Sequence, residues 1–298
     1  MSQRSIAPLL LIVAALFGTC ETVLIRLIGE QLSLGQILMF RAGAQVLLVS
    51  LLAGVLTGNG LAMMRTKRIW GHLSRGALAS VAWWCGFMSF RLLELPLATT
   101  LSFSSQLFLL LLAWPMLGER VTRSRIAATL LGLAGVLVAL EMWRPGGIDW
   151  RVSYGLTSAF LGAIMTILTR SLTFTERTET IMFYMAGVVF LSAVPQAVVT
   201  WVPFQPRTIA LMTLLALSGT MATYFFVEAY RRAEASALAP YPYSRFIFAA
   251  IFGYVLFADP IRPATLVGAV LIALGNLLPV MVARRSKRRA PDDTNAPG

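Results

Sequence analysis

Runs of about 20 apolar residues recur along almost the whole chain, and no other feature limits its fold as strongly. The hydrocarbon core of a bilayer is about 30 Å thick and needs roughly 17 to 25 apolar residues per helix. Ten runs meet this requirement, at residues 6–28, 34–56, 69–93, 97–117, 126–142, 152–172, 181–202, 209–230, 237–257 and 264–282. Since the connections are short, the sequence predicts an all-α integral membrane protein with ten transmembrane helices and no soluble domain.

The composition agrees with this prediction and removes most classes of enzyme. Charged residues make up 13% of the chain, whereas soluble domains typically contain about 25%. The single histidine, His72, adjoins a basic loop, and Cys20 and Cys85 lie inside apolar runs, so we expect no metal site. The aspartates fall in predicted loops or in the tail, which leaves no paired carboxylates for proteolysis within the membrane. We therefore expect no cofactor, no catalytic residue and no enzymatic activity.

The excess of positive charge, formally +12, is unevenly distributed. Lys and Arg concentrate in alternate connections, such as the loop with Arg65, Lys67 and Arg68, and in the sequence RRSKRR after the tenth span. The positive-inside rule then places both termini in the cytoplasm and the protein in the inner membrane. We expect the basic tail to bind anionic lipid, at about 1 kcal/mol per basic residue, and we expect no binding of nucleic acid.

The chain contains an internal repeat. FRLLELPLATTLSFSSQLFLLLLAWPMLGE, which starts at Phe90, aligns without a gap with YRRAEASALAPYPYSRFIFAAIFGYVLFAD, which starts at Tyr230. The earlier spans align when Gly18 is placed on Gly162. We predict a five-span repeat at 1–147, a second at 148–283 and a disordered basic tail at 284–298. Because five is odd, the second repeat enters the membrane from the opposite side, which is the inverted-repeat architecture of secondary transporters.

Two stretches carry a resemblance to a known family. PLATTLSFSSQLFLLLLAWPMLGERVTRSRIAATLLGLAGVLVAL and SALAPYPYSRFIFAAIFGYVLFADPIRPATLVGAVLIALG resemble the paired signature of the EamA-like branch of the drug/metabolite transporter superfamily. FADP replaces the second GE-type turn, and Trp114 and Pro115 stand in the fourth span, departures that leave the fold unchanged. The resemblance implies a ten-helix exporter or importer of small metabolites. Similar bacterial proteins include exporters of amino acids, aromatic ones among them, and carriers of S-adenosylmethionine or riboflavin.

Ionisable side chains inside the spans mark candidate sites, because each costs at least about 2.5 to 3.5 kcal/mol in a bilayer. Glu21 and Arg41 both lie seven residues from the outer end of their spans, about 10 Å deep, so we expect an ion pair. The pair either joins two helices or also contacts a zwitterionic substrate. Arg245, about 12 Å into the ninth span, either lines the cavity or extends to the cytoplasmic headgroups.

The ninth span also has a proline-rich start. Pro240 and Pro242 in the string APYPYSR each remove a backbone donor and kink a helix, which frees carbonyl groups that a cavity or a neighbouring helix must satisfy. We predict a hinge at these prolines. The equivalent string of the first half, TTLSFSS, has Thr100 and Ser102 in their place, so we expect an asymmetric kink.

Aromatic residues in mid-span form a third group. Trp83 and Trp84 differ by about 100° around a helix, so at most one faces the centre, and we favour Trp84 because its repeat partner is Tyr224. Such rings either form a slot for a planar substrate or only pack helices together. The predicted substrate-binding residues are Glu21, Arg41, Trp84, Phe103, Tyr224, Tyr241, Tyr243 and Arg245.

These features favour a secondary transporter, and a monomer suffices for its architecture. We expect export of amino acids with apolar or aromatic side chains by alternating access, with import of S-adenosylmethionine, riboflavin or a similar metabolite as the alternative. A channel would show a continuous polar stripe along several spans, whereas isolated ionisable residues are present. A membrane-embedded binding protein or receptor would need a ligand-binding domain. Charges at turns, such as Glu119 and Asp259, are expected to be solvated and to form no site.

Overall fold

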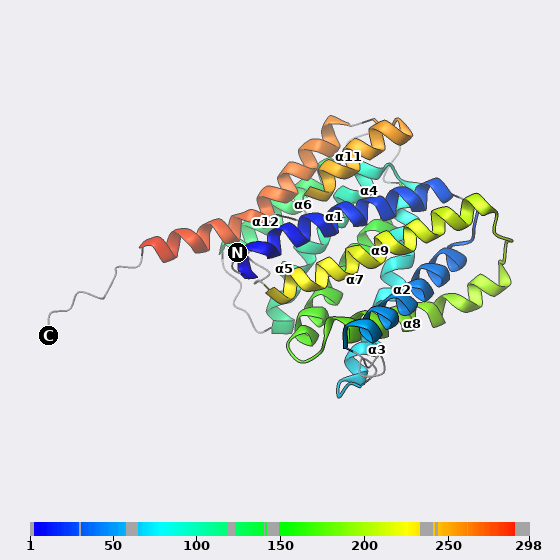
Figure 1. Ribbon diagram of the computed structural model, residues 1–298. Helices are drawn as coiled ribbons and strands as arrows, with labels where there is room; N and C mark the ends of the chain where they lie inside the picture. Colours follow the sequence, from blue (N-terminus) through cyan, green and yellow to red (C-terminus); the bar gives the residue numbers. More distant parts are fainter. Residues whose placement is uncertain are drawn as a thin grey trace.

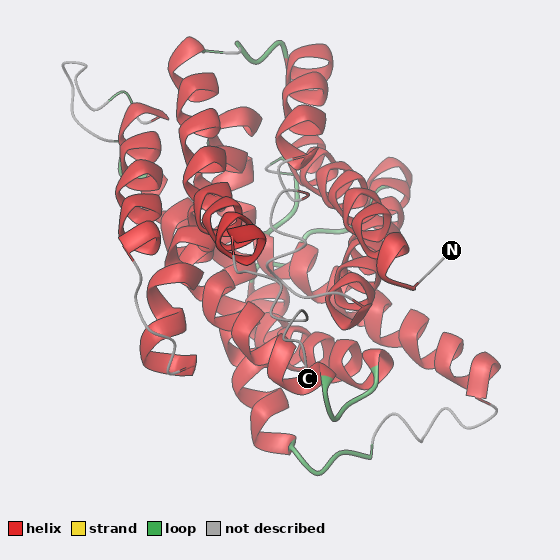
Figure 2. Cartoon of the chain, turned by 90° about the vertical axis from the view of Figure 1, so that its left-hand side faces the viewer, coloured by secondary structure: helices red, strands yellow, loops and turns green. Residues whose placement is uncertain are grey.

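The computed structural model describes residues 3–29, 31–57, 65–117, 123–139, 141, 149–232, 241, 244–260 and 262–289, whose regular structure is entirely helical. The helices are α1 (Gln3–Ile28), α2 (Leu34–Thr57), α3 (Ile69–Leu92), α4 (Leu95–Ser102), α5 (Ser104–Leu117), α6 (Arg123–Ala139), α7 (Val152–Thr173), α8 (Thr178–Val199), α9 (Pro206–Arg232), α11 (Ser244–Phe257) and α12 (Pro263–Arg289). They form a bundle, which Figure 2 shows with its helices in red.

The outer surface of the bundle suits a lipid environment. Among the described helices, α1, α2, α7, α8 and α9 are long and apolar enough to cross a membrane, and α11 and the first part of α12 are shorter apolar helices. Large apolar side chains are exposed around the bundle, including Leu47, Leu51, Leu191 and Val199. In water these side chains would be unfavourably hydrated, whereas lipid tails solvate them, and helices satisfy their own backbone groups there.

The bounds of the helices follow the internal repeat of the sequence. Under the alignment that places Phe90 on Tyr230, the described residues of α5 correspond to those of α11, and the first described residue of α6 corresponds to the first residue of α12. The alignment of the earlier spans, which places Gly18 on Gly162, puts the first residue of α2 on that of α8. The two halves of the chain therefore build the same succession of helices.

Packing between the halves is crosswise. α1 packs along α9, and α3 packs along α7; since α7 and α9 correspond to α1 and α3, this is one pairing with the halves exchanged (Figure 1). α2 packs against its own counterpart α8, and α6 against α12. The pattern is that of a pseudo-twofold axis, which lies in the membrane plane when each half has five spans. The chain is thus an all-helical membrane protein of two inverted repeats.

The fourth span is interrupted at Phe103, between α4 and α5. The Phe103 N–H donates to the carbonyls of Thr99 and Thr100 at 3.3 and 3.1 Å, which closes the last turn of α4. The hydroxyls of Thr100 and Ser102 also donate to carbonyls of α4, at 2.8 and 2.6 Å. The first half therefore breaks its helix without a proline, because hydroxyl groups compete for the backbone carbonyls there.

Several predicted features lie outside the described residues, and one predicted boundary is wrong. The hinge prolines Pro240 and Pro242 lie outside them, and so do the junction of the repeats at 147 and 148 and residues 290–298. α12 continues to Arg289, so residues 284–289, which we expected to be part of a disordered tail, are helical.

Candidate functional site

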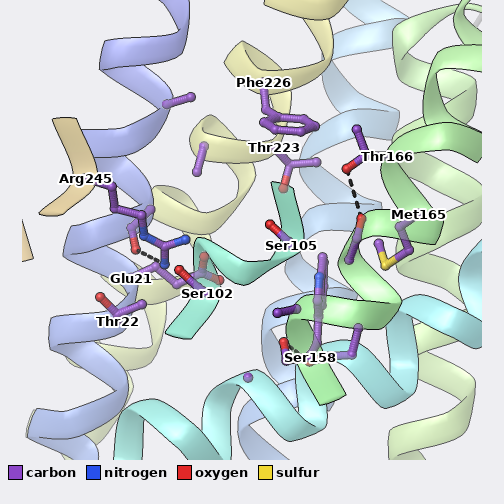
Figure 3. A pocket seen from close by; sticks show the side chains of 18 of the residues that line it. Glu21, Thr22, Ser102, Ser105, Ser158, Met165, Thr166, Thr223, Phe226 and Arg245 are labelled. Atoms are coloured by element: carbon purple, nitrogen blue, oxygen red, sulfur yellow. Dashed lines mark hydrogen bonds between the residues drawn. The ribbon is translucent and has the colours of Figure 1, made fainter. Parts of the chain in front are cut away.

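A cavity of about 370 Å³ lies between the two halves of the chain. Its walls come from α1, α2, α3, α7, α8, α9 and α11 and from the break between α4 and α5. The polar lining residues are Glu21, Thr22, Arg41, Arg75, Ser102, Ser105, Ser158, Thr166, Thr169, Thr223 and Arg245. Figure 3 shows Glu21, Thr22 and Arg245 on one side of the cavity and Ser158, Met165 and Thr166 on the other.

The predicted ion pair between Glu21 and Arg41 is confirmed. Arg41 Nε donates to Glu21 Oε1, which joins α2 to α1, and Arg41 Nη1 donates to Gln45 Oε1 at 2.9 Å. Gln45 Nε2 donates in turn to the carbonyl of Met182 in α8 at 3.3 Å. Gly219 of α9 leaves room for the pair, because a Cβ there would lie 2.8 Å from Arg41 Nη2. A hydrogen-bonded chain therefore links three helices at the cavity wall.

Arg245 reaches the cavity from the second position of α11. Its Nη2 donates to the carbonyl of Gly18 at 3.5 Å, and its guanidinium carbon lies 5.2 Å from the ring centre of Phe90. Its Nε is buried and has no hydrogen-bond partner among the described residues, a situation that costs about 1–3 kcal/mol. The side chain thus lines the cavity instead of extending to the headgroups, and its contact with a substrate stays a prediction.

Arg75 is a lining residue that the sequence analysis missed. Its position near the start of α3 suggested a connecting loop, but the residue is only 3% exposed. Arg75 Nε donates to Thr169 Oγ1 of α7 at 2.8 Å, and Nη1 donates to the carbonyl of Ile181 in α8 at 3.3 Å. Among the described residues it forms no ion pair with a carboxylate. An ionisable residue inside a predicted span was the signal that could have identified it.

The structure turns Trp83, not Trp84, toward the cavity. The Trp83 ring lies 3.7 Å from the guanidinium carbon of Arg41 and belongs to the cavity wall. Trp84 packs edge-to-face on Tyr154, with 5.6 Å between ring centres, and is not among the described lining residues. Phe103, at the helix break, lines the cavity as expected.

The two predicted tyrosines that the structure describes, Tyr224 and Tyr241, lie outside the cavity wall. Tyr224 packs against the cluster around Met182, and its neighbour Thr223 lines the cavity instead. Tyr241 packs against α1, near Leu11. Tyr243 lies outside the described residues.

Ion pairs join the two halves at the end of the bundle that the charge distribution predicts to be outside. Arg26 Nη2 donates to Asp259 Oδ1 at 2.8 Å, and a second contact joins Arg26 Nη1 to Asp259 Oδ2. Asp259 is 4% exposed, so the expectation of a solvated turn was wrong. Arg262 Nη2 contacts Glu94 at 2.6 Å, and its Nη1 contacts Glu141 at 3.4 Å. These charges tie the second half to the ends of α1, α3 and α6.

Two inverted helical repeats around a cavity with ionisable walls define the class of secondary transporters. The chain belongs to the EamA-like transporter family, whose model matches residues 5–140 and again residues 149–281. It is a multi-pass membrane transporter of small molecules and not an enzyme.

Relatives of the chain are named for different substrates and directions. It is 31% identical over 236 residues to a riboflavin transporter of Rhizobium johnstonii, covering 77% of this chain and 76% of the relative. It is 28% identical over 233 residues to an S-adenosylmethionine uptake transporter of Rickettsia felis, covering 78% of each. A pseudopaline exporter of Pseudomonas aeruginosa is 26% identical over 274 residues, 89% of this chain and 93% of the relative. A crystal structure with 18% identity covers 95% of this chain and 99% of its own with a TM-score of 0.67, which supports the fold.

Proposed function

We propose that this transporter exports a small metabolite with a carboxylate and an apolar or aromatic body, for which amino acids are the first candidates. The observation that carries the proposal is Arg245, a cation at the cavity wall whose buried Nε has no hydrogen-bond partner in the part of the chain that the structure describes. A carboxylate would complete its hydrogen bonds, and bonds to charged groups contribute roughly 1.5–3 kcal/mol. Glu21 offers a partner for an ammonium group, and Trp83 and Phe103 offer an apolar wall.

Ion pairs join the two halves at the end of the bundle that is predicted to be outside. They favour the interpretation as a carrier over the interpretation as a channel. Arg26 with Asp259, and Arg262 with Glu94, hold the two halves together there. We propose that these contacts separate when a solute leaves the cavity on that side, as one half moves against the other in alternating access.

Import is the second candidate, since one relative is named as an S-adenosylmethionine uptake transporter. We further propose that the chain lies in the inner membrane with both termini in the cytoplasm. The alternation of basic connections supports this orientation. In Figure 1 the end of α12 leaves the bundle on the side where α1 begins, as the orientation requires.

Counterflow in proteoliposomes tests the proposal. We expect labelled phenylalanine to enter faster when the liposomes contain unlabelled phenylalanine, because a loaded carrier returns faster than an empty one. Arg245→Gln should lower the rate at least tenfold. Arg170→Gln is the matched control, because Arg170 is exposed on α7 and should leave the rate unchanged. A rate that ignores preloading, or equal rates for the two variants, would contradict the proposal.

Two adjacent tryptophans provide a test of the aromatic wall. Trp83→Ala should slow transport of phenylalanine more than that of threonine, because it removes a ring from the cavity wall. Trp84→Ala is the control, since its ring packs on Tyr154. The same selectivity change in both variants would show that the ring acts through helix packing.

A further inference from the structure

The cavity wall carries more positive than negative charge. Three arginines line it, Arg41, Arg75 and Arg245, whereas Glu21 is the single carboxylate among the described lining residues. Glu21 already pairs with Arg41, so neither Arg75 nor Arg245 forms an ion pair with a carboxylate in the described part of the chain. Glu21 acts on Arg245 only as a more distant charge. An excess of charge in a membrane is costly, and residues that carry it usually mark the path of a substrate of opposite charge.

The three guanidinium groups are spaced along one helix. Arg75 stands on α3, the guanidinium of Arg41 lies over the ring of Trp83, and that of Arg245 lies near the ring of Phe90. At 1.5 Å per residue, the steps along α3 from Arg75 to Trp83 and from Trp83 to Phe90 are about 12 Å and about 10 Å. On α1, however, Arg245 contacts the carbonyl of Gly18, one turn from Glu21, so Arg245 lies beside the Arg41 pair. Arg75, which contacts Thr169 and Ile181, is the cation that stands apart.

One helix terminus adds to the positive potential. α11 is a 14-residue helix whose first turn reaches the cavity with Arg245. The N-terminus of a helix carries a partial positive charge, and half-helices of transporters direct such ends toward anionic groups of the substrate. Within the described residues the buried Nε of Arg245 has no hydrogen-bond partner, and together with this terminus it favours an acidic ligand.

From this arrangement we infer that the substrate is an organic dianion with two separate acidic groups joined by an apolar or aromatic body. The inference rests on the proposed transport function. It keeps the carboxylate and the apolar or aromatic body, and it places a second acidic group where an amino acid has its ammonium group. One acidic group binds Arg245 beside the Arg41 pair, while the second binds Arg75. Its body lies against Trp83, Phe87 and Phe103.

Four ligands that differ in charge, three of which carry a phenyl ring, test this charge requirement on the unmodified protein. Phenylsuccinate has two separate carboxylates, phenylphosphate has its charge on one group, phenylalanine is a zwitterion and S-adenosylmethionine is a net cation. Competition against counterflow in proteoliposomes gives an affinity for each. We expect phenylsuccinate to compete at least tenfold better than phenylalanine, and better than phenylphosphate and S-adenosylmethionine. Inward phenylsuccinate transport should also slow when a potassium diffusion potential makes the liposome interior negative.

Variants at the far cation give a second test. Arg75→Gln should weaken competition by phenylsuccinate about tenfold and that by phenylalanine less than threefold. Arg75→Lys should restore most of the loss because it keeps the charge, and it serves if Arg75→Gln does not fold. Arg170→Gln removes an arginine from an exposed position on α7 and should change neither affinity.

The outcomes separate the two levels of the proposal. Counterflow of phenylalanine with no competition by phenylsuccinate would overturn the dianion and leave the carrier intact. Equal competition by phenylphosphate and phenylsuccinate would overturn the requirement for two separate groups. If preloading stimulates uptake of no compound in the series, the carrier itself is refuted.

Discussion

Breaking the ion pair between Glu21 and Arg41 should cost more than removing it. The pair is buried, and Arg41 is 3% exposed. Removing one partner of a buried pair typically costs about 3–5 kcal/mol, because the remaining charge stays in a medium that solvates it poorly, whereas replacing both with apolar residues is often close to neutral. We therefore expect the double variant Glu21→Leu/Arg41→Met to be more stable than Arg41→Met alone.

The contacts also predict which single substitution lowers the free energy of unfolding more. After Glu21→Gln, Arg41 keeps its bond to Gln45 and its place over the ring of Trp83, so we expect a loss of about 1–3 kcal/mol. After Arg41→Met, Glu21 has no second hydrogen-bond partner among the described residues, and we expect the full loss of about 3–5 kcal/mol.

Reversible unfolding in mixed micelles, followed by far-ultraviolet circular dichroism, measures these differences. The free energies of unfolding of the wild type, both single variants and the double variant form a double-mutant cycle. Arg170→Leu, at an exposed position, controls for loss of an arginine as such. Losses that simply add in the double variant would refute the reasoning, because they would show that neither charge depends on the other.

Three further predictions concern packing, the outer ion pairs and topology. Gly135→Ala should destabilise the protein by about 1–3 kcal/mol, since its Cβ would lie 2.7 Å from the carbonyl of Gly268 in α12, whereas Gly187→Ala meets nothing within 4 Å and should be neutral or stabilising in the same unfolding assay. Asp259→Asn should loosen the outer end and increase labelling of a cysteine placed in the cavity by a membrane-impermeant reagent added outside; unchanged labelling would contradict a closing role. A reporter fused after Arg289 should score as cytoplasmic, and a periplasmic signal would overturn the predicted orientation.

The fold followed from the sequence because it depends on patterns that repeat. Lipid requires long apolar helices, and the same two alignments of the halves also relate the described residues of α5 to those of α11 and the start of α2 to that of α8. The break at Phe103 was not expected, since it relies on several weak hydroxyl-to-carbonyl bonds instead of a proline. Such bonds compete with helical ones only where the surroundings favour them.

The site was predicted in part. The Glu21–Arg41 pair could be predicted from the sequence because both residues lie at the same depth on successive spans. Trp84 was favoured over Trp83 because it aligns with Tyr224, but the structure describes Tyr224 in the cluster around Met182 and not in the cavity wall. Around a helix Trp83 lies about 80° from Arg75 and Trp84 about 180°, so a buried Arg75 would have indicated the correct ring. The Arg26–Asp259 contact joins residues 233 positions apart, so no local sequence pattern predicts it.

The crosswise packing of the halves also determines at what stage of synthesis each charged side chain can form its contacts. Glu21 and Arg41 are separated by 20 positions on consecutive helices, so they can pair as soon as the second span has been inserted. Arg75 must wait for Thr169 and Ile181, which follow it by 94 and 106 positions. At roughly 5–20 residues per second, that delay is about 5–20 s. During this time the ribosome-bound first half presents an unsatisfied guanidinium to the bilayer. The face of α1 that packs on α9 stays uncovered for longer, since α9 begins only at Pro206. An insertion chaperone can bind this surface until α9 has been inserted.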